Sequence, residues 1–220
     1  MDRRSSRIMS KLRRLLPEYS WIPVAAVVIC NFAVYYITKF AVPESSRHYI
    51  DMSVDRAIPV IPFFVVFYVL CYLQWAVSWI MAGRESRSVC FRFAKADIAA
   101  KLICLVCFIV YPTIIERPSI EVTDFFTWAL NFIYAADRPL NCLPSIHVLA
   151  SWIAMRAAFV MKKPGNAYKA VMAVITVLCM FSVIFTKQHY VIDIPAGILA
   201  AEAGLAISKL LSDEKFLWVR

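Results

Sequence analysis

The chain has 220 residues, of which 61% are hydrophobic and 18% charged, compared with about 45–50% and 25% in an average soluble protein. Its four glycines (Gly83, Gly165, Gly197 and Gly204) are too scattered to form a dinucleotide-binding motif or a P-loop. The net charge of +9 would suit nucleic acid, but apolar runs of about twenty residues indicate a bilayer instead. We therefore predict an integral membrane protein whose partners are lipids and not nucleic acid.

Residues 1–20 carry six basic residues and are predicted to form a cytoplasmic tail on the membrane surface. Six apolar runs follow, each close to the length of about 20 residues that crosses the hydrocarbon core: 21–42, 58–82, 96–115, 145–161, 168–186 and 191–211. The first run is too long for a signal-peptide core and is interpreted as a retained anchor. We expect an all-α polytopic membrane protein, with a bundle of about six transmembrane helices over residues 21–212 and a second cytoplasmic tail at 213–220.

Charged residues divide the connections between these runs into two groups. One group, with the tails, is mainly basic: Arg84, Arg87, Arg92, Lys95, Lys162, Lys163, Lys169, Lys215 and Arg220. The other connections mix acidic and basic residues. The positive-inside rule places the basic group in the cytoplasm and the mixed group on the non-cytoplasmic side, with the cell membrane as the expected location.

The longest outer connection, residues 116–143, mixes apolar residues such as Phe125 and Leu130 with Glu121 and Asp124, and Trp128 adds an aromatic anchor. This mixture favours an amphipathic helix at the membrane interface. An irregular loop packed over the bundle is the alternative.

Three polar segments, all on the outer side, hold the candidate site residues. In the last of them, His189 and Asp193 are four residues apart and would share one face of a helix. A carboxylate bonded to one imidazole nitrogen leaves the other nitrogen free as a nucleophile or base. A purely structural hydrogen bond is the alternative. Nearby Lys187 is a candidate anion ligand, although a solvated interfacial lysine explains it equally well.

The second segment begins the fourth predicted helix at Pro144 and Ser145, and His147 lies just inside the first turn. Free N–H groups at a helix N-terminus form an anion site. The alternative is a capping serine beside an interfacial histidine. The first segment ends the third predicted helix with Arg117 and Pro118.

Together these residues suit a phosphoryl group. Arg117, Lys187 and the helix N-terminus would bind its oxygens, one histidine would attack, and the other would protonate the leaving oxygen. The sequence contains no cluster of carboxylates for a two-metal mechanism. We therefore expect chemistry that needs neither a metal nor another cofactor.

The segments PSIH (144–147) and TKQHYVID (186–193) resemble the second and third signatures of the type 2 phosphatidic acid phosphatase superfamily, and the resemblance covers roughly residues 96–205. It implies that His189 is a nucleophile that becomes phosphohistidine, with Asp193 as its orienting partner. It also implies that His147 is the acid for the leaving group and that Ser145 binds phosphate oxygens.

The chain departs from these signatures at several positions. Ile146 replaces the usual glycine, and Val183 replaces an arginine, a gap for which Lys187 is a candidate. The first signature survives as Arg117-Pro118, whereas Arg138-Pro139 is a rival match. The patterns around both Arg-Pro pairs are more similar to the inositol-phosphorylceramide synthase branch than to the acid phosphatases.

The resulting hypothesis is a membrane lipid phosphate or diphosphate phosphatase. The alternatives are a lipid phosphotransferase of the inositol-phosphorylceramide or sphingomyelin synthase type, and a non-catalytic lipid-binding or transport protein on the same scaffold. The oligomeric state stays open. Arg156 and Glu202 lie at equal depth in their predicted helices, which would allow a buried intramembrane ion pair facing away from the catalytic side.

Overall fold

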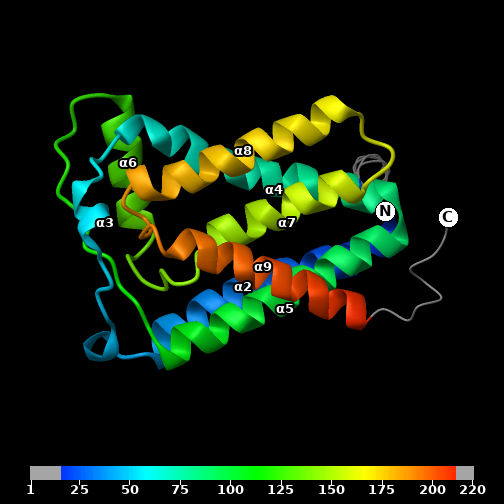
Figure 1. Ribbon diagram of the computed structural model, residues 1–220, viewed down its shortest axis with the longest axis horizontal. Helices are drawn as coiled ribbons and strands as arrows, with labels where there is room; N and C mark the ends of the chain where they lie inside the picture. The colour runs from blue at the N-terminus through cyan, green and yellow to red at the C-terminus, as the bar shows by residue number, and fades with distance from the viewer. Residues whose placement is uncertain (1–15, 212–220) are drawn as a thin grey trace, which may run out of the picture.

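The computed structural model describes residues 16–211. Its long helices run side by side as a bundle (Figure 1). They are α2 (Trp21–Ala41), α4 (Val65–Glu85), α5 (Arg87–Val110), α7 (Ile146–Val160), α8 (Asn166–Phe185) and α9 (Asp193–Leu210). The shorter elements are η1 (Glu18–Ser20), η2 (Glu44–Ser46), α3 (Ser53–Ala57), η3 (Pro62–Phe64) and α6 (Phe125–Ala136). No strand occurs among residues 16–211, so the all-α prediction is confirmed.

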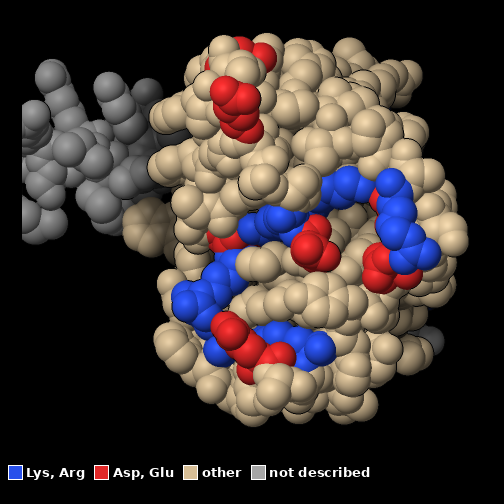
Figure 2. All heavy atoms as spheres, turned by 90° about the vertical axis from the view of Figure 1, so that its left-hand side faces the viewer, with Lys and Arg blue, Asp and Glu red and all other residues tan. Residues whose placement is uncertain are grey.

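The start of α2 and the end of α9 lie at the same end of the bundle (Figure 1). The short helices α3 and α6 and the long connections gather at the opposite end, where charged side chains of both signs cover part of the surface (Figure 2). Most of the predicted cytoplasmic tails, namely residues 1–15 of the first tail and all of 213–220, lies outside the described residues.

Three helical segments are long and apolar enough to cross a membrane by themselves: Glu18–Ala41, Pro62–Glu85 and Asn166–Phe185. Of the other three long helices, α7 has 15 residues, and both α5 and α9 carry several charged residues. These three pack against one another, while α2 packs on α5, and α4 and α8 pack on α7. The count of six membrane crossings therefore stays a prediction.

The connection between α4 and α5 differs from the predicted basic loop. It consists of Ser86 alone, whose hydroxyl accepts the Val89 N–H at 3.2 Å and caps α5. Because of this cap, α5 begins at Arg87 rather than near residue 96, and the basic residues expected in the loop lie within α4 and α5. The helix ends at Val110, two residues before Pro112, as the restricted backbone before a proline requires.

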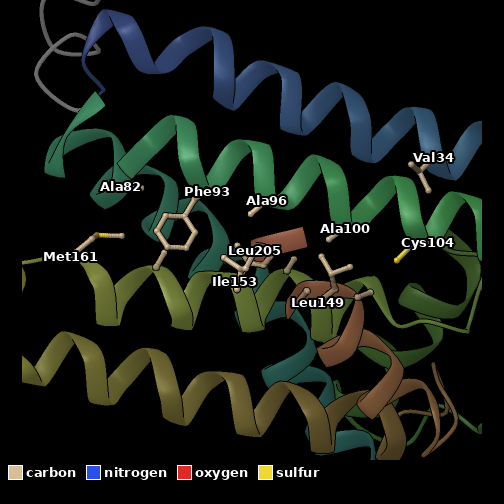
Figure 3. Close-up of a cluster of buried hydrophobic side chains, with 14 of the residues drawn as sticks. Val34, Ala82, Phe93, Ala96, Ala100, Cys104, Leu149, Ile153, Met161 and Leu205 are labelled. Atoms are coloured by element: carbon tan, nitrogen blue, oxygen red, sulfur yellow. The ribbon is translucent and has the colours of Figure 1, made fainter. Parts of the chain in front are cut away.

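The core consists largely of small side chains, which let the helices approach closely (Figure 3). At Gly204 of α9, an added Cβ would lie 2.3 Å from the Ala96 carbonyl oxygen and 2.8 Å from the Ala100 Cβ of α5. At Gly197, about two turns further towards the polar end, an added Cβ would lie 2.7 Å from the Ser145 carbonyl oxygen. Glycine at these positions therefore sets how closely α9 packs against α5 and against the start of α7.

Arg156 of α7 and Glu202 of α9 form the ion pair that their equal depth would allow, with 3.4 Å between Nε and Oε1. The Trp152 indole also donates to Glu202 at 2.7 Å. The two charged side chains are 50% and 39% exposed, so the pair lies on the outside of the bundle and is not buried as expected.

Candidate active site

His189 lies in the turn between α8 and α9, and Asp193 is the first residue of α9. The two side chains therefore meet across a turn rather than along one helix. His189 Nδ1 is 3.1 Å from Asp193 Oδ2 and 2.9 Å from the Cys142 carbonyl oxygen. Both partners are acceptors, so Nδ1 must carry the hydrogen, which leaves the Nε2 lone pair free to attack. Asp193 is fully buried, and its Oδ2 also accepts the Tyr190 N–H at 2.9 Å.

The loop that supplies the Cys142 carbonyl is fixed by residues distant in sequence. The buried hydroxyl oxygen of Thr113 accepts the N–H groups of Cys142 at 3.1 Å and of Leu143 at 3.0 Å. Asn141 has a φ of 59°, a conformation that asparagine adopts more readily than most residues, and its side chain donates to Thr38 of α2 at 2.6 Å. These contacts hold the carbonyl against His189.

His147 lies in the first turn of α7, with its ring centroid 5.8 Å from that of His189. The ring packs among aromatic side chains of α4, at 4.5 Å from Tyr68 and 5.6 Å from Trp75 between centroids. Its Nε2 is 3.0 Å from the Tyr72 hydroxyl. The two histidines thus lie side by side, as the resemblance implies, and Tyr72 is a contact that sequence reasoning missed.

Both histidines line a cavity of about 780 Å³ that is mainly apolar. The deeper walls come from α2, α4, α5 and α7, and the polar end holds the histidines together with Arg117, Asp137, Arg138, Asn141 and Gln188. Burial raises the pKa of the Asp137 carboxyl, and the positive charge of Arg117 partly opposes this shift. A mainly apolar cavity with a small polar end suits a ligand that has a long apolar part and a charged head.

Arg117 lies in the connection after α5, not at its end. Its Nη1 donates to the carbonyl oxygens of Asp137 at 2.6 Å and Tyr134 at 3.4 Å, and Nη2 donates to Gln188 Oε1. Arg117 Nε and Gln188 Nε2 are buried donors without a hydrogen-bond partner in the part of the chain that the structure describes. Both residues line the polar end of the cavity, although these two nitrogen atoms are themselves buried. Sequence reasoning found Arg117 but not Gln188.

The remaining predicted ligands do not line the cavity. Lys187 Nζ donates to the carbonyl oxygens of Asp55 at 2.6 Å and Ile58 at 2.7 Å, which ties the turn to α3. Partial burial lowers the pKa of Lys187, although nearby Asp55 opposes this. Ser145 is buried, and its hydroxyl oxygen accepts the Val148 N–H at 3.4 Å as an N-cap.

Arg138, the residue of the rival Arg-Pro pair, does line the cavity, but its exposed side chain pairs with Glu44 at 3.2 Å. Arg117 is the more buried of the two arginines and reaches Gln188, the neighbour of His189. The geometry therefore favours Arg117 over Arg138 as the arginine of the site.

Comparison with known families gives one match. A family model described as PAP2 superfamily matches residues 54–207, from α3 through most of α9. This range is well over half of the chain and includes Arg117, both histidines and Asp193. No curated protein matches the sequence.

Proposed function

The chain belongs to the PAP2 superfamily, and from this premise we propose that it is an integral membrane enzyme that removes phosphate from a lipid phosphate or diphosphate through a phosphohistidine intermediate. The observation that carries the proposal is the cavity. One mainly apolar space is lined by two adjacent histidines and by Arg117 and Gln188, each of which has a buried N–H donor without a partner among the described residues, and it is large enough for much of a lipid chain.

In the first step, His189 Nε2 attacks phosphorus while the bond to the lipid oxygen breaks. Asp193 and the Cys142 carbonyl accept the Nδ1–H and stabilise the positive charge that develops on the ring. His147 donates its proton to the leaving oxygen, so a lipid phosphate departs as an alcohol and a lipid diphosphate departs as a lipid monophosphate. The negative charge of the bound phosphate stabilises the protonated form of His147 beforehand.

In the second step, His147 accepts a proton from water, whose oxygen attacks the phosphohistidine and releases inorganic phosphate. This returns His147 to its protonated form and His189 to its neutral form. In both steps, Arg117 Nε and Gln188 Nε2 donate to the phosphoryl oxygens, where charge accumulates in the transition state. Ser145 acts indirectly, because its cap fixes the turn of α7 that carries His147.

We also propose that all six long helices cross the membrane, with the polar end of the cavity on the non-cytoplasmic side. The central position of α5, α7 and α9 supports this, because neighbouring helices shield part of their polar residues from lipid. On α6, Phe125, Trp128 and Phe132 are exposed along one face, with neighbouring rings about 6 Å apart. Such an aromatic row suits a helix lying at the outer membrane interface.

The test is chemical trapping of the intermediate. Purified protein in detergent, without divalent cations, is mixed with a lipid phosphate labelled on phosphorus and quenched in base, in which phosphohistidine survives. Wild-type protein should carry label on His189 and release phosphate, whereas His189→Ala should do neither. His48→Ala is the matched control, since His48 is exposed, stacks on Tyr111 and does not line the cavity.

Turnover without label on any histidine, or with unchanged rate in His189→Ala, would contradict the mechanism. Label that passes to a lipid or polyol hydroxyl instead of water would identify the phosphotransferase alternative. Binding of lipid phosphate without any label or turnover would identify the non-catalytic alternative.

A further inference from the structure

An ion pair lies in the apolar part of the cavity, away from the residues that the proposed reaction uses. Asp97 and Lys101 are one turn apart on α5, with 2.6 Å between Oδ2 and Nζ. They are only 2% and 4% exposed, yet both line the cavity, as does Asn31 of α2. Ionisable groups inside a membrane bundle are costly and mark functional positions by default. Because an apolar pair of similar volume would often stabilise a fold as well, stability alone does not explain this pair.

The ion pair lies deeper in the bundle than the histidines. On α9, Gly204 faces Ala96 and Ala100, the neighbours of Asp97 and Lys101 in α5. Gly197 of the same helix faces Ser145 and Leu149, which lie two residues to either side of His147. The two glycines are seven residues apart, which is about 10 Å along α9 at a rise of 1.5 Å per residue. The ion pair therefore lies about two helical turns deeper than the reacting end.

This depth is where the first atoms of a lipid tail must lie when its phosphate is at His189. An alkyl or isoprenoid phosphate would place only C–H groups against the two charges. A lipid with a hydroxyl or amide group a few bonds from its phosphate ester would instead donate a hydrogen bond to the Asp97 carboxylate and accept one from the Lys101 ammonium group. Hydrogen bonds to charged groups in such an apolar surrounding are stronger than neutral ones.

We propose that Asp97 and Lys101 form a recognition site for the hydroxyl or amide groups that a lipid phosphate carries next to its phosphate ester. The proposal rests on the proposed function for the position of the phosphate. It assigns the substrate to lipids with a polar backbone, in preference to plain alkyl or isoprenoid phosphates.

The experiment compares two lipid monophosphates of equal chain length, an N-acyl amino-alcohol phosphate with a free hydroxyl and an unsubstituted alkyl phosphate. Their affinities are measured on His189→Ala protein in lipid nanodiscs, where no turnover occurs, and their turnover is measured on the protein with His189 intact. We expect the amide- and hydroxyl-bearing lipid to bind about 10- to 100-fold more tightly, the effect of one or two hydrogen bonds to charged groups. Asp97→Asn combined with Lys101→Met should reduce this preference to a few-fold at most.

Val28→Ala is the matched control, because it removes apolar surface from the same cavity and should weaken both lipids alike. If the neutral double variant does not fold, the charge-exchanged variant Asp97→Lys with Lys101→Asp keeps an ion pair while it exchanges donor and acceptor, and it should also lose most of the preference. Equal affinity for the two lipids in His189→Ala protein with Asp97 and Lys101 intact would overturn the proposal. A preference for the amide- and hydroxyl-bearing lipid that is unchanged in the folded Asp97/Lys101 variants would also overturn it. A clear binding preference without phosphate release from either lipid would sustain it and refute the proposed function instead.

Discussion

Gln188→Glu isolates one donor of the proposed phosphate site. In the structure, Gln188 Oε1 accepts from Arg117, whereas Nε2 is buried without a partner among the described residues. A glutamate keeps the acceptor for Arg117 and replaces the unused donor with an oxygen. Loss of one hydrogen bond to a charged group costs about 1.5–3 kcal/mol, and the added negative charge repels the phosphate. We therefore expect kcat/KM to fall by about 10²–10³, as for the loss of one oxyanion donor.

Phosphate release from a short-chain lipid phosphate in detergent measures this effect, with folding checked by size-exclusion chromatography and thermal unfolding. Asn131→Asp is the matched amide-to-acid control. Asn131 donates to the Ile120 carbonyl at 2.9 Å, lies on α6 and does not line the cavity, so kcat/KM should stay within a few-fold. A folded Gln188→Glu protein with kcat/KM within about threefold of the unsubstituted enzyme would refute the assignment of Gln188 as a hydrogen-bond donor to the phosphate.

Asp193→Asn should lower turnover by about 10²–10³, because the Cys142 carbonyl still accepts the Nδ1–H of His189. In a catalytic triad whose carboxylate is the only acceptor for the histidine, the same substitution costs about 10⁴. A loss of about 10⁴ here would contradict the role of the Cys142 carbonyl. The dependence of turnover on pH should be bell-shaped, since His189 must be neutral and His147 protonated. Tyr72→Phe should shift only the limb of this pH–rate curve that His147 sets, because the Tyr72 hydroxyl contacts His147. An unchanged curve would show that the hydroxyl does not act on His147. Gly204→Ala should destabilise the protein by about 1–3 kcal/mol in thermal unfolding, whereas Gly165→Ala, with no atom within 4 Å of its Cβ, should change stability by less than about 1 kcal/mol. A reporter fused at Lys163 should be cytoplasmic, and an external signal would reverse the proposed orientation.

The helices and the contact between His189 and Asp193 could be predicted because their sequence signals are local. Apolar runs near twenty residues identify the long helices, and the spacing of His189 and Asp193 brings their side chains together even though a turn, not a helix, connects them. The early start of α5 was missed because hydropathy does not register a basic but helix-compatible stretch after a capping serine.

The polar end of the cavity was less predictable, because its contacts join distant parts of the chain. Arg117 and Gln188 are 71 residues apart, and Tyr72 and His147 are 75 apart. Of the neighbouring turn residues Lys187 and Gln188, the charge of Lys187 makes it the better predicted anion ligand. However, its backbone has a φ of 50°, and its side chain reaches α3 instead of the cavity. No pattern in the sequence specifies which of two neighbouring turn residues faces inward.

The helix α2 contributes a wall of the cavity, including Val28 and Asn31, but precedes residue 54, where the family match begins. The groups of the proposed reaction, by contrast, all lie within the matched range. In the proposed function, chemistry and part of the lipid selection would therefore be encoded in separate, contiguous stretches of the chain. We expect substitutions within residues 21–41 to alter which lipid chains fit without changing any of the proposed reacting groups. In the laboratory, the same separation makes this one helix a compact target for a library that retunes lipid preference.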